Sequence, residues 1–363
     1  MKKIVLIPLI ILIIGVCLAL AGFAAGGLQG FWVDRGGMHL KGADLGDLIK
    51  VNETYKGFKN IQVNADYIGR VTLKEGDGYT VRGENYERYG GLAASLNGDT
   101  LEIEAKREKK WLANFGLDEL WDTESTFLEI TYPKGADLGD IRVDIAMSKV
   151  SAAGIACGKL DIRNDFGSID VSGASCGDMA LRAAAGAVSL AGADVEGTCD
   201  IRDDFGNVEM KDVSAKTLSA ELSSGSLKAS SLDAATMKIS SDFGKIVLDG
   251  AEAEDMTLKL ASGDLQADNV TTGGLTVINE FGKTTLDRLL FTGRCEIDAS
   301  SGSVALKLRM VEDDLSYELE ASAGSVSVDG AKFSGSVRNR APAASASLTV
   351  RCDFGSVNLD FLK

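Results

Sequence analysis

The chain has 363 residues, a pI near 4.7 and a formal net charge of −15, with 53 acidic against 38 basic residues. Binding to nucleic acid requires clustered Lys and Arg that displace counterions from the phosphates, so this charge balance excludes nucleic acid as a partner. The length suits one large domain or two ordinary ones.

The chain begins with Met1-Lys2-Lys3 and continues as an uncharged run that is most apolar between Ile4 and Ala25. A run of about twenty apolar residues is long enough to cross a bilayer. Residues 1–27 are therefore predicted to be a transmembrane anchor, followed by a linker over residues 28–50. A cleaved signal peptide is the competing interpretation, because Ala19 and Ala21 are small enough for a cleavage site. With Lys2 and Lys3 inside, the retained anchor predicts a single-pass protein of the cell membrane with an extracytoplasmic body.

Residues 51–135 show strand patterns without a strict repeat, and we predict that they form a β-rich N-terminal cap. Terminal units of a repeat protein must shield a core that has no neighbour, which is the role expected of this segment. Inside it, Trp111, Phe115 and Trp121 stand in a charged stretch. They form either a flap packed over the end of the core or an exposed aromatic contact for a partner, a glycan or a membrane surface.

Residues 136–363 contain a repeat that is marked by glycine. The phrase NDFGSIDV at Asn164 returns as DDFGNVEM, SDFGKIVL, NEFGKTTL and CDFGSVNL, with weaker copies between them. Most steps are 19 or 20 residues. The repeat glycines are Gly167, Gly186, Gly206, Gly225, Gly244, Gly263, Gly282, Gly302, Gly324 and Gly355.

Equivalent positions of the repeat carry equivalent side chains. In the first copy, Leu160 and Ile162 precede the glycine and Ile169 follows it, and nearly all copies are apolar at these places. A spacing of two is the period of a β-strand, so each coil is expected to hold two short strands separated by a bend at glycine. The prediction is an all-β chain, a single-chain β-solenoid of about eleven coils of roughly nineteen residues. A lengthened step between Gly324 and Gly355 predicts an inserted loop from Asn339 to Ser347 near the end of the stack.

The repeat also doubles, because a phenylalanine precedes every second glycine from Gly167 to Gly282 and precedes Gly355 again three steps later. The five pairs are Phe166 and Gly167, Phe205 and Gly206, Phe243 and Gly244, Phe281 and Gly282, and Phe354 and Gly355. The intervening coils carry Ala or Ser instead. We expect the phenylalanines to be structural, with large side chains packed against small ones in neighbouring layers of the core.

The repeat resembles a bacterial β-strand-repeat family of unknown function that is labelled "putative adhesin". The resemblance rests on the Phe-Gly-x-Val/Ile coils from Gly167 to Val357 and on the strand and turn from Leu128 to Gly135, and it covers roughly Val51 to Leu362. It implies a Gly-punctuated β-solenoid behind an N-terminal membrane segment or signal. It also suggests a link to envelope-stress systems, near which some members are encoded.

Catalytic motifs are weak in this chain. The DFG phrase of protein kinases occurs here without a Gly-rich phosphate loop or an HRD segment, and a catalytic motif would not be repeated. In the row Asp165, Asp204, Asp242, Glu280 and Asp353, neighbours are spaced two coils apart, or about 9.6 Å, which is too far for a calcium site without further ligands. His39 is the one histidine. We therefore predict no catalytic residues, no metal and no cofactor.

Two of the six cysteines are candidates for a disulfide. Cys157 and Cys176 each lie ten residues before a repeat glycine, so they are expected to stack in adjacent coils within bonding range. Export permits a bond, and a stacked pair of free thiols is equally consistent with this spacing.

Long solenoids present regular faces, which commonly serve as binding surfaces. The sequence predicts a non-enzymatic binding or scaffold protein of the cell envelope, adhesin-like or linked to envelope stress, whose partner is an unidentified envelope protein or polymer. The alternative is a β-helix enzyme acting on an envelope glycan.

Overall fold

A computed structural model describes residues 31–34, 37–40, 46–106, 126–342 and 344–362. These residues form an all-β structure, with two short 3-10 helices at Glu87–Tyr89 and Glu312–Asp314. No helix within them has the length and hydropathy needed to cross a bilayer. The predicted anchor over residues 1–27 lies outside the described residues.

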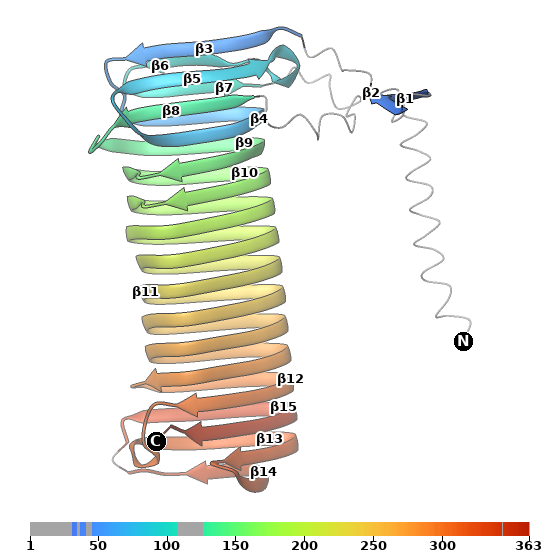
Figure 1. Ribbon diagram of the computed structural model, residues 1–363. Coiled ribbons are helices and arrows are strands. Elements are labelled where there is room, and N and C mark those ends of the chain that lie inside the picture. Colours follow the sequence, from blue (N-terminus) through green and yellow to red (C-terminus); the bar gives the residue numbers. More distant parts are fainter. Residues whose placement is uncertain (1–30, 35–36, 41–45, 107–125, 343, 363) are drawn as a thin grey trace.

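The long body of the molecule is a stack of parallel coils (Figure 1). Ile162 pairs with Leu181 and Gly167 with Gly186, so the neighbouring coil lies nineteen residues further along the chain. This parallel register matches the repeat predicted from the sequence. The strands of the stack are β9 (Leu138–Ala153), β10 (Ala156–Ser172), β11 (Ser175–Phe291), β12 (Arg294–Leu308), β13 (Leu315–Val328), β14 (Ala331–Asn339) and β15 (Ala346–Phe361).

The N-terminal end of the stack is covered by shorter strands. β4 pairs in parallel with β9 and carries β7 and β8 as further neighbours, while β5 and β3 extend the same sheet. These strands are β3 (Leu48–Tyr55), β4 (Asn60–Gly76), β5 (Tyr79–Tyr86), β6 (Ala93–Asn97), β7 (Thr100–Ala105) and β8 (Phe127–Pro133). A separate hairpin joins β1 (Phe31–Asp34) to β2 (Gly37–Leu40).

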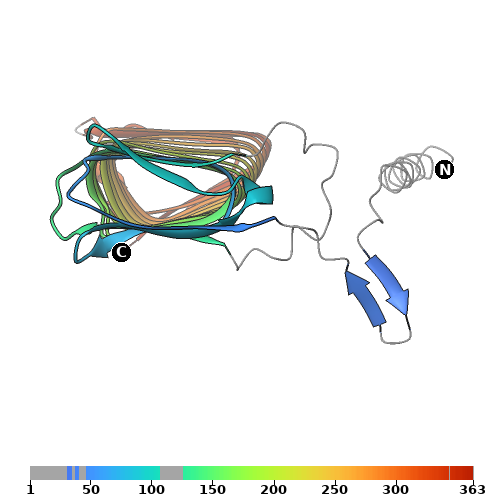
Figure 2. The ribbon, with the colours of Figure 1, turned by 90° about the horizontal axis from the view of Figure 1, so that it is seen from above.

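Each coil contains three runs of buried side chains. Figure 2 looks down the stack of coils. Around Gly167 the first run contains Leu160 and Ile162, the second contains Ile169 and Val171, and all four are buried. A third run follows, in which Ala174 and Cys176 are buried. The prediction of two strands per coil therefore missed the third run.

A second corner separates the second and third runs of each coil. It lies six residues after the repeat glycine, where the backbone is left-handed at Asp212, Ser231, Gly250, Asn269 and Arg288, with φ between 51° and 75°. Glycine does not mark this corner consistently, because Asn, Asp, Ser and Arg also occupy it. The glycine pattern therefore gave no sign of a third run.

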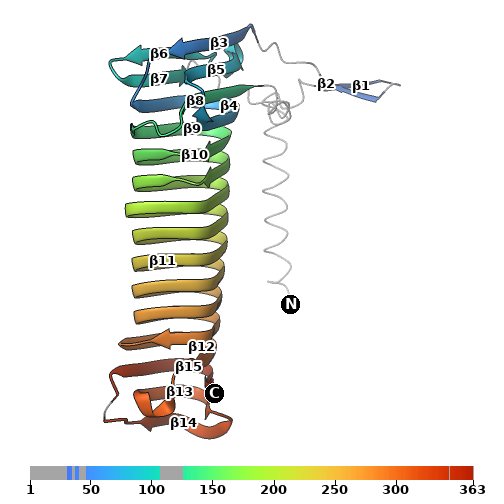
Figure 3. The same ribbon diagram turned by 60° about the vertical axis from the view of Figure 1, so that its left-hand side comes forward.

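The C-terminal coils are not stacked in chain order. The spatial order is β12, β15, β13 and β14, so the last strand of the chain inserts between two earlier ones (Figures 1 and 3). Gly302 pairs with Gly355, and β14 pairs antiparallel with β13 at the end of the sheet. A connection does follow β14, as predicted. The order of the repeat glycines would stack the coil of Gly355 beyond the coil of Gly324, and this order is wrong. β14 first closes the end of the stack, and the chain then returns to insert β15 between β12 and β13.

Candidate functional site

Five phenylalanines form an exposed line along one corner of the solenoid. Their exposed fractions are between 55% and 68%, although large aromatic side chains are usually well buried. We call this set, with the small residues between its members, the phenylalanine column. Its aromatic members are Phe166, Phe205, Phe243, Phe281 and Phe354.

The column alternates strictly between large and small residues in space. Phe166 pairs with Ala185, and Phe281 pairs with Ser301, which pairs in turn with Phe354. The insertion of β15 places Phe354 two coils from Phe281, whereas the order of repeats in the sequence would place it three coils away. Ala185, Ser224, Ser262 and Ser301 are small and only partly exposed, so a coil with a small side chain separates each ring from the next.

The packing role expected for the phenylalanines is wrong. Strand alternation points the residue three before each glycine inward, and the bend at the glycine then turns the phenylalanine outward instead of back into the core. The inward position carries a polar side chain in these coils, and Asn164, Asp203, Ser241 and Asn279 are all buried. The Asn164 amide donates to the backbone oxygens of Ser148 and Ser168 at 2.8 and 3.3 Å, which compensates part of its burial.

Asp203 is the acidic member of this buried polar set. Its pKa is raised from 3.8 to about 6, chiefly by burial and to a smaller extent by the charge of the neighbouring Asp204, while the backbone N–H of Phe205 acts in the opposite direction. Asn164 and Asn279 occupy the equivalent position in other coils with an uncharged amide. An ionised carboxylate at this place therefore costs free energy that an amide does not.

The predicted row of acids lies beside the column, two residues before each repeat glycine. Asp165 accepts a hydrogen bond from Arg163 Nε at 3.1 Å, and Asp204, Asp242, Glu280 and Asp353 are exposed. In the part of the chain that the structure describes, no three His, Cys, Asp or Glu side chains are grouped so as to hold a metal ion.

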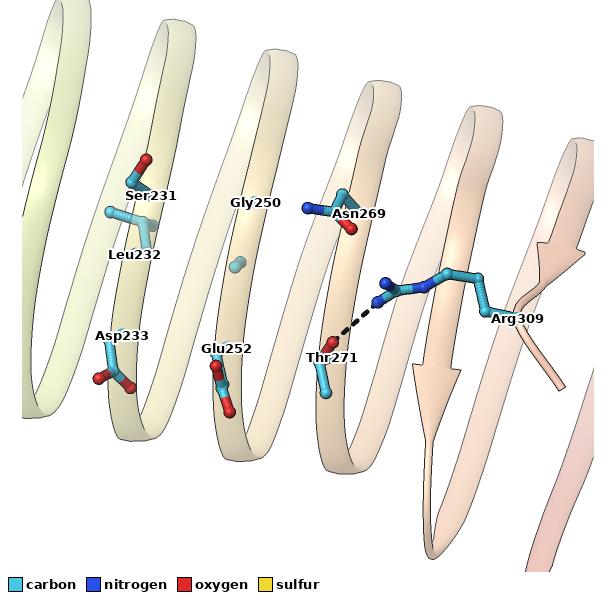
Figure 4. A pocket seen from close by; sticks show the side chains of 9 residues that line it. Ser231, Leu232, Asp233, Gly250, Glu252, Asn269, Thr271 and Arg309 are labelled. Atoms are coloured by element: carbon cyan, nitrogen blue, oxygen red, sulfur yellow. Dashed lines mark hydrogen bonds between the residues drawn. The ribbon is translucent and has the colours of Figure 1, made fainter.

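The second corner of the coils carries a shallow open groove of about 420 Å³ (Figure 4). Ser231 and Asn269 line it at left-handed positions, and Asp233 and Glu252 add carboxylates from adjacent coils. Arg309 reaches into the groove and donates from Nη2 to Thr271 Oγ1 at 2.9 Å. The glycine and apolar pattern of the sequence does not indicate this groove. The Ser and Asn residues that lie six positions after their repeat glycines, Ser231 and Asn269, are the signal that marks it.

Cys157 and Cys176 are paired across adjacent coils, as their spacing predicted, and their sulfur atoms are 3.3 Å apart. Both are free thiols in the structure. The hydrogen bond between them raises the pKa of Cys157 and lowers that of Cys176, which makes Cys176 the more readily ionised of the two.

We expect mild oxidation of the full chain by a glutathione redox couple to join Cys157 to Cys176, because the thiolate needs to move little to reach its partner. Mass spectrometry after alkylation under denaturing conditions will detect the linked peptides. Cys157→Ser is the control and leaves Cys176 open to alkylation. Complete alkylation of both thiols after prolonged oxidation of the unmodified chain would contradict the prediction.

The remaining described cysteines belong to the core. Cys199, Cys295 and Cys352 are buried, and burial raises the pKa of Cys199 to about 12. The candidate contact residues Trp111, Phe115 and Trp121 lie outside the described residues, so their role stays a prediction.

Comparison with protein families agrees with the repeat. The model described as Toastrack DUF4097 matches residues 58–231 and again residues 198–360, which together span most of the chain. The chain belongs to the Toastrack DUF4097 family. The two overlapping matches reflect the internal repeat, since successive coils of this Toastrack chain carry the same pattern.

Solved structures resemble this Toastrack chain at low identity. A "putative lipid binding protein" from Parabacteroides distasonis is 13% identical, with 88% of this chain and 98% of that chain covered and a TM-score of 0.34. A "putative adhesin" from Bacteroides fragilis is 11% identical, with coverage of 86% and 97% and a TM-score of 0.28. A "putative cell adhesion protein" from Clostridium sporogenes is 9% identical, with coverage of 87% and 100% and a TM-score of 0.24. No curated protein matches the chain.

Proposed function

We propose that this Toastrack chain is a non-enzymatic binding or scaffold protein of the cell envelope, and that the phenylalanine column is its contact surface. The observation that carries the proposal is the line of five phenylalanines exposed by more than half. Exposing these aromatic rings to water costs free energy, and exposed apolar patches of this kind mark interaction sites. Adhesion is consistent with this role.

The envelope location is part of the same proposal. The apolar run before residue 28 anchors the chain in the cell membrane by a single span, and the body lies outside the cytoplasm. The acidic surface, with a net charge of −15, favours a partner that does not carry a strong negative charge.

The test is a capture experiment on solubilised envelope with the full chain as bait in a nonionic detergent. We expect the variant Phe243→Ser/Phe281→Ser to lose the captured partner, because aromatic anchors dominate interface energies. Lys211→Ser/Lys238→Ser is the matched control, since it changes two exposed residues elsewhere on the coils and retains capture.

Equal capture by both variants would contradict the role of the column. If no variant captures a partner and the chain releases reducing ends from envelope glycan, the alternative function as a glycan-cleaving enzyme replaces this one. The groove at Asp233 and Glu252 would then be the first place to substitute.

A further inference from the structure

The phenylalanine column has a geometry that fits a copy of itself. A ring stands on every second coil, and a hollow floored by Ala or Ser lies on each coil between. Adjacent coils are about 4.8 Å apart, so rings and hollows alternate with a regular step. A second column shifted by one coil places each of its rings over a hollow of the first.

The alternation selects the orientation of the second copy. In a parallel two-fold pair each coil faces its own equivalent, so rings meet rings and the hollows stay empty. A parallel pair shifted by one coil fills the hollows, but it leaves unsatisfied surface at both ends and continues as an open assembly. An antiparallel two-fold pair fills the hollows and closes.

From this we infer that two copies of the chain associate antiparallel through the phenylalanine column, about a two-fold axis between the coils of Gly244 and Gly263. The inference rests on the proposed function and identifies the partner of that surface as a second copy. The axis sets Phe166 over Ala323 of the second copy, Phe205 over Ser301, Phe243 over Ser262, Phe281 over Ser224 and Phe354 over Ala185.

The charges beside the column agree with this arrangement. An antiparallel two-fold axis brings each flank of the column against the same flank of the second copy. On the flank after the glycines, Lys245 then faces Asp264 of the second copy, and both side chains are exposed. The axis repeats this pair, so one dimer contains it twice.

The acidic flank also avoids direct repulsion. The acids two residues before Gly206, Gly244, Gly282 and Gly355 alternate with small residues in the coils between them. The shift of one coil sets each acid opposite an uncharged side chain of the second copy. The acids are Asp204, Asp242, Glu280 and Asp353, and the residues that face them are Ser300, Ala261, Ser223 and Ala184.

The size of the surface is adequate for a specific dimer. The five rings in the overlap expose on the order of 600 Å² of aromatic surface per copy, from ~200 Å² for a phenylalanine. The flanking residues add to this, and a standard interface buries about 800 Å² per partner. At physiological salt the Debye length is about 8 Å, which screens most of the repulsion between two chains of net charge −15.

The test measures self-association of the full chain in a nonionic detergent by sedimentation equilibrium, with the solvent density matched to the detergent. We expect a dimer whose Kd rises about tenfold or more in Phe243→Ser, as for an aromatic residue at the centre of an interface. Val311→Ser is the control. This apolar side chain is 60% exposed but lies outside the phenylalanine column, so the Kd stays unchanged.

Two further sets of variants separate this pairing from unspecific association. Ser262→Phe adds apolar surface, but the new ring fills a hollow that the second copy needs, so we expect it to weaken the dimer. Unspecific association through apolar surface would become stronger in the same variant. Lys245→Glu and Asp264→Lys each weaken the dimer severalfold by placing like charges together. The double variant restores it, because the pair is re-formed with its signs exchanged.

A chain that stays monomeric up to about 100 µM would overturn the inference, since this is far above the Kd expected for an interface of standard size. So would an equal effect of Val311→Ser and Phe243→Ser, or a dimer strengthened by Ser262→Phe. If the chain is monomeric but captures an envelope component through the column, the proposed function stands and the second copy is not the partner.

Discussion

Replacing Gly225 by alanine is expected to destabilise the solenoid by more than about 4 kcal/mol, in the range of the most damaging single substitutions. A Cβ on Gly225 would lie 1.6 Å from the backbone oxygen of Gly206 in the adjacent coil. The obstruction is backbone, so no side-chain rotation relieves it. The backbone of Gly225, at φ of 136°, is also unfavourable for a residue with a Cβ.

The same collision recurs down the stack, because Gly244 meets Gly225 and Gly263 meets Gly244 in the same way. The coils cannot separate at one level without breaking the parallel hydrogen bonds on both sides. We expect Gly225→Ala to lower the urea midpoint of unfolding, followed by far-UV circular dichroism. Local hydrogen exchange should rise first in the coils on either side of the substitution.

Gly250→Asn is the matched control for this prediction. Gly250 lies at the second corner with φ of 75°, and the nearest atom to an added Cβ is 3.7 Å away. Asn269 adopts the same left-handed backbone one coil further on. The control should change the free energy of unfolding by less than about 1 kcal/mol. A Gly225→Ala protein as stable as this control would show that the glycines are not held by close packing between coils.

Asp203→Asn is expected to stabilise the protein by about 1–3 kcal/mol at neutral pH. Raising the pKa of the carboxyl from 3.8 to about 6 corresponds to a cost of about 3 kcal/mol for its charged form in the folded state. Asparagine has nearly the same shape and carries no charge. It already serves at this position in the coils of Gly167 and Gly282.

The effect depends on pH with a defined sign. Between about pH 4 and 6 the folded state binds more protons at Asp203 than the unfolded state, so the unmodified protein loses stability as pH rises through this window. Above about pH 6 the carboxyl is ionised in both states, so the loss of stability no longer changes with pH. Urea unfolding at about pH 7.5 should therefore separate the two proteins, and at about pH 3.5 the difference should nearly vanish.

Asp204→Asn provides the control for this second prediction. Asp204 is adjacent in sequence but exposed, so water solvates its charge and the substitution should leave stability almost unchanged. If Asp203→Asn does not raise the free energy of unfolding at neutral pH, or raises it equally at both pH values, then ionising the buried carboxyl does not destabilise the folded protein.

Local pattern was sufficient to predict the coil. The recurrence of glycine every 19 or 20 residues, with apolar residues at fixed distances from it, determined the parallel register, the all-β class and the stacking of Cys157 on Cys176. These features depend on the strand period and on the repeat length, both of which can be counted along the chain.

Two features depended on contacts between coils. Ser241 is buried, and strand alternation would therefore place Phe243, two residues later, inward as well. The bend at Gly244 turns the side chain of Phe243 outward instead. The insertion of β15 between β12 and β13 joins segments that are remote in the chain, and it completes the alternation of the phenylalanine column at Phe354. Period counting treats neighbours in sequence as neighbours in space. Close backbone packing at the glycines and the need to close the end of the stack are both long-range effects, so the folded chain was required to show which face the rings occupy.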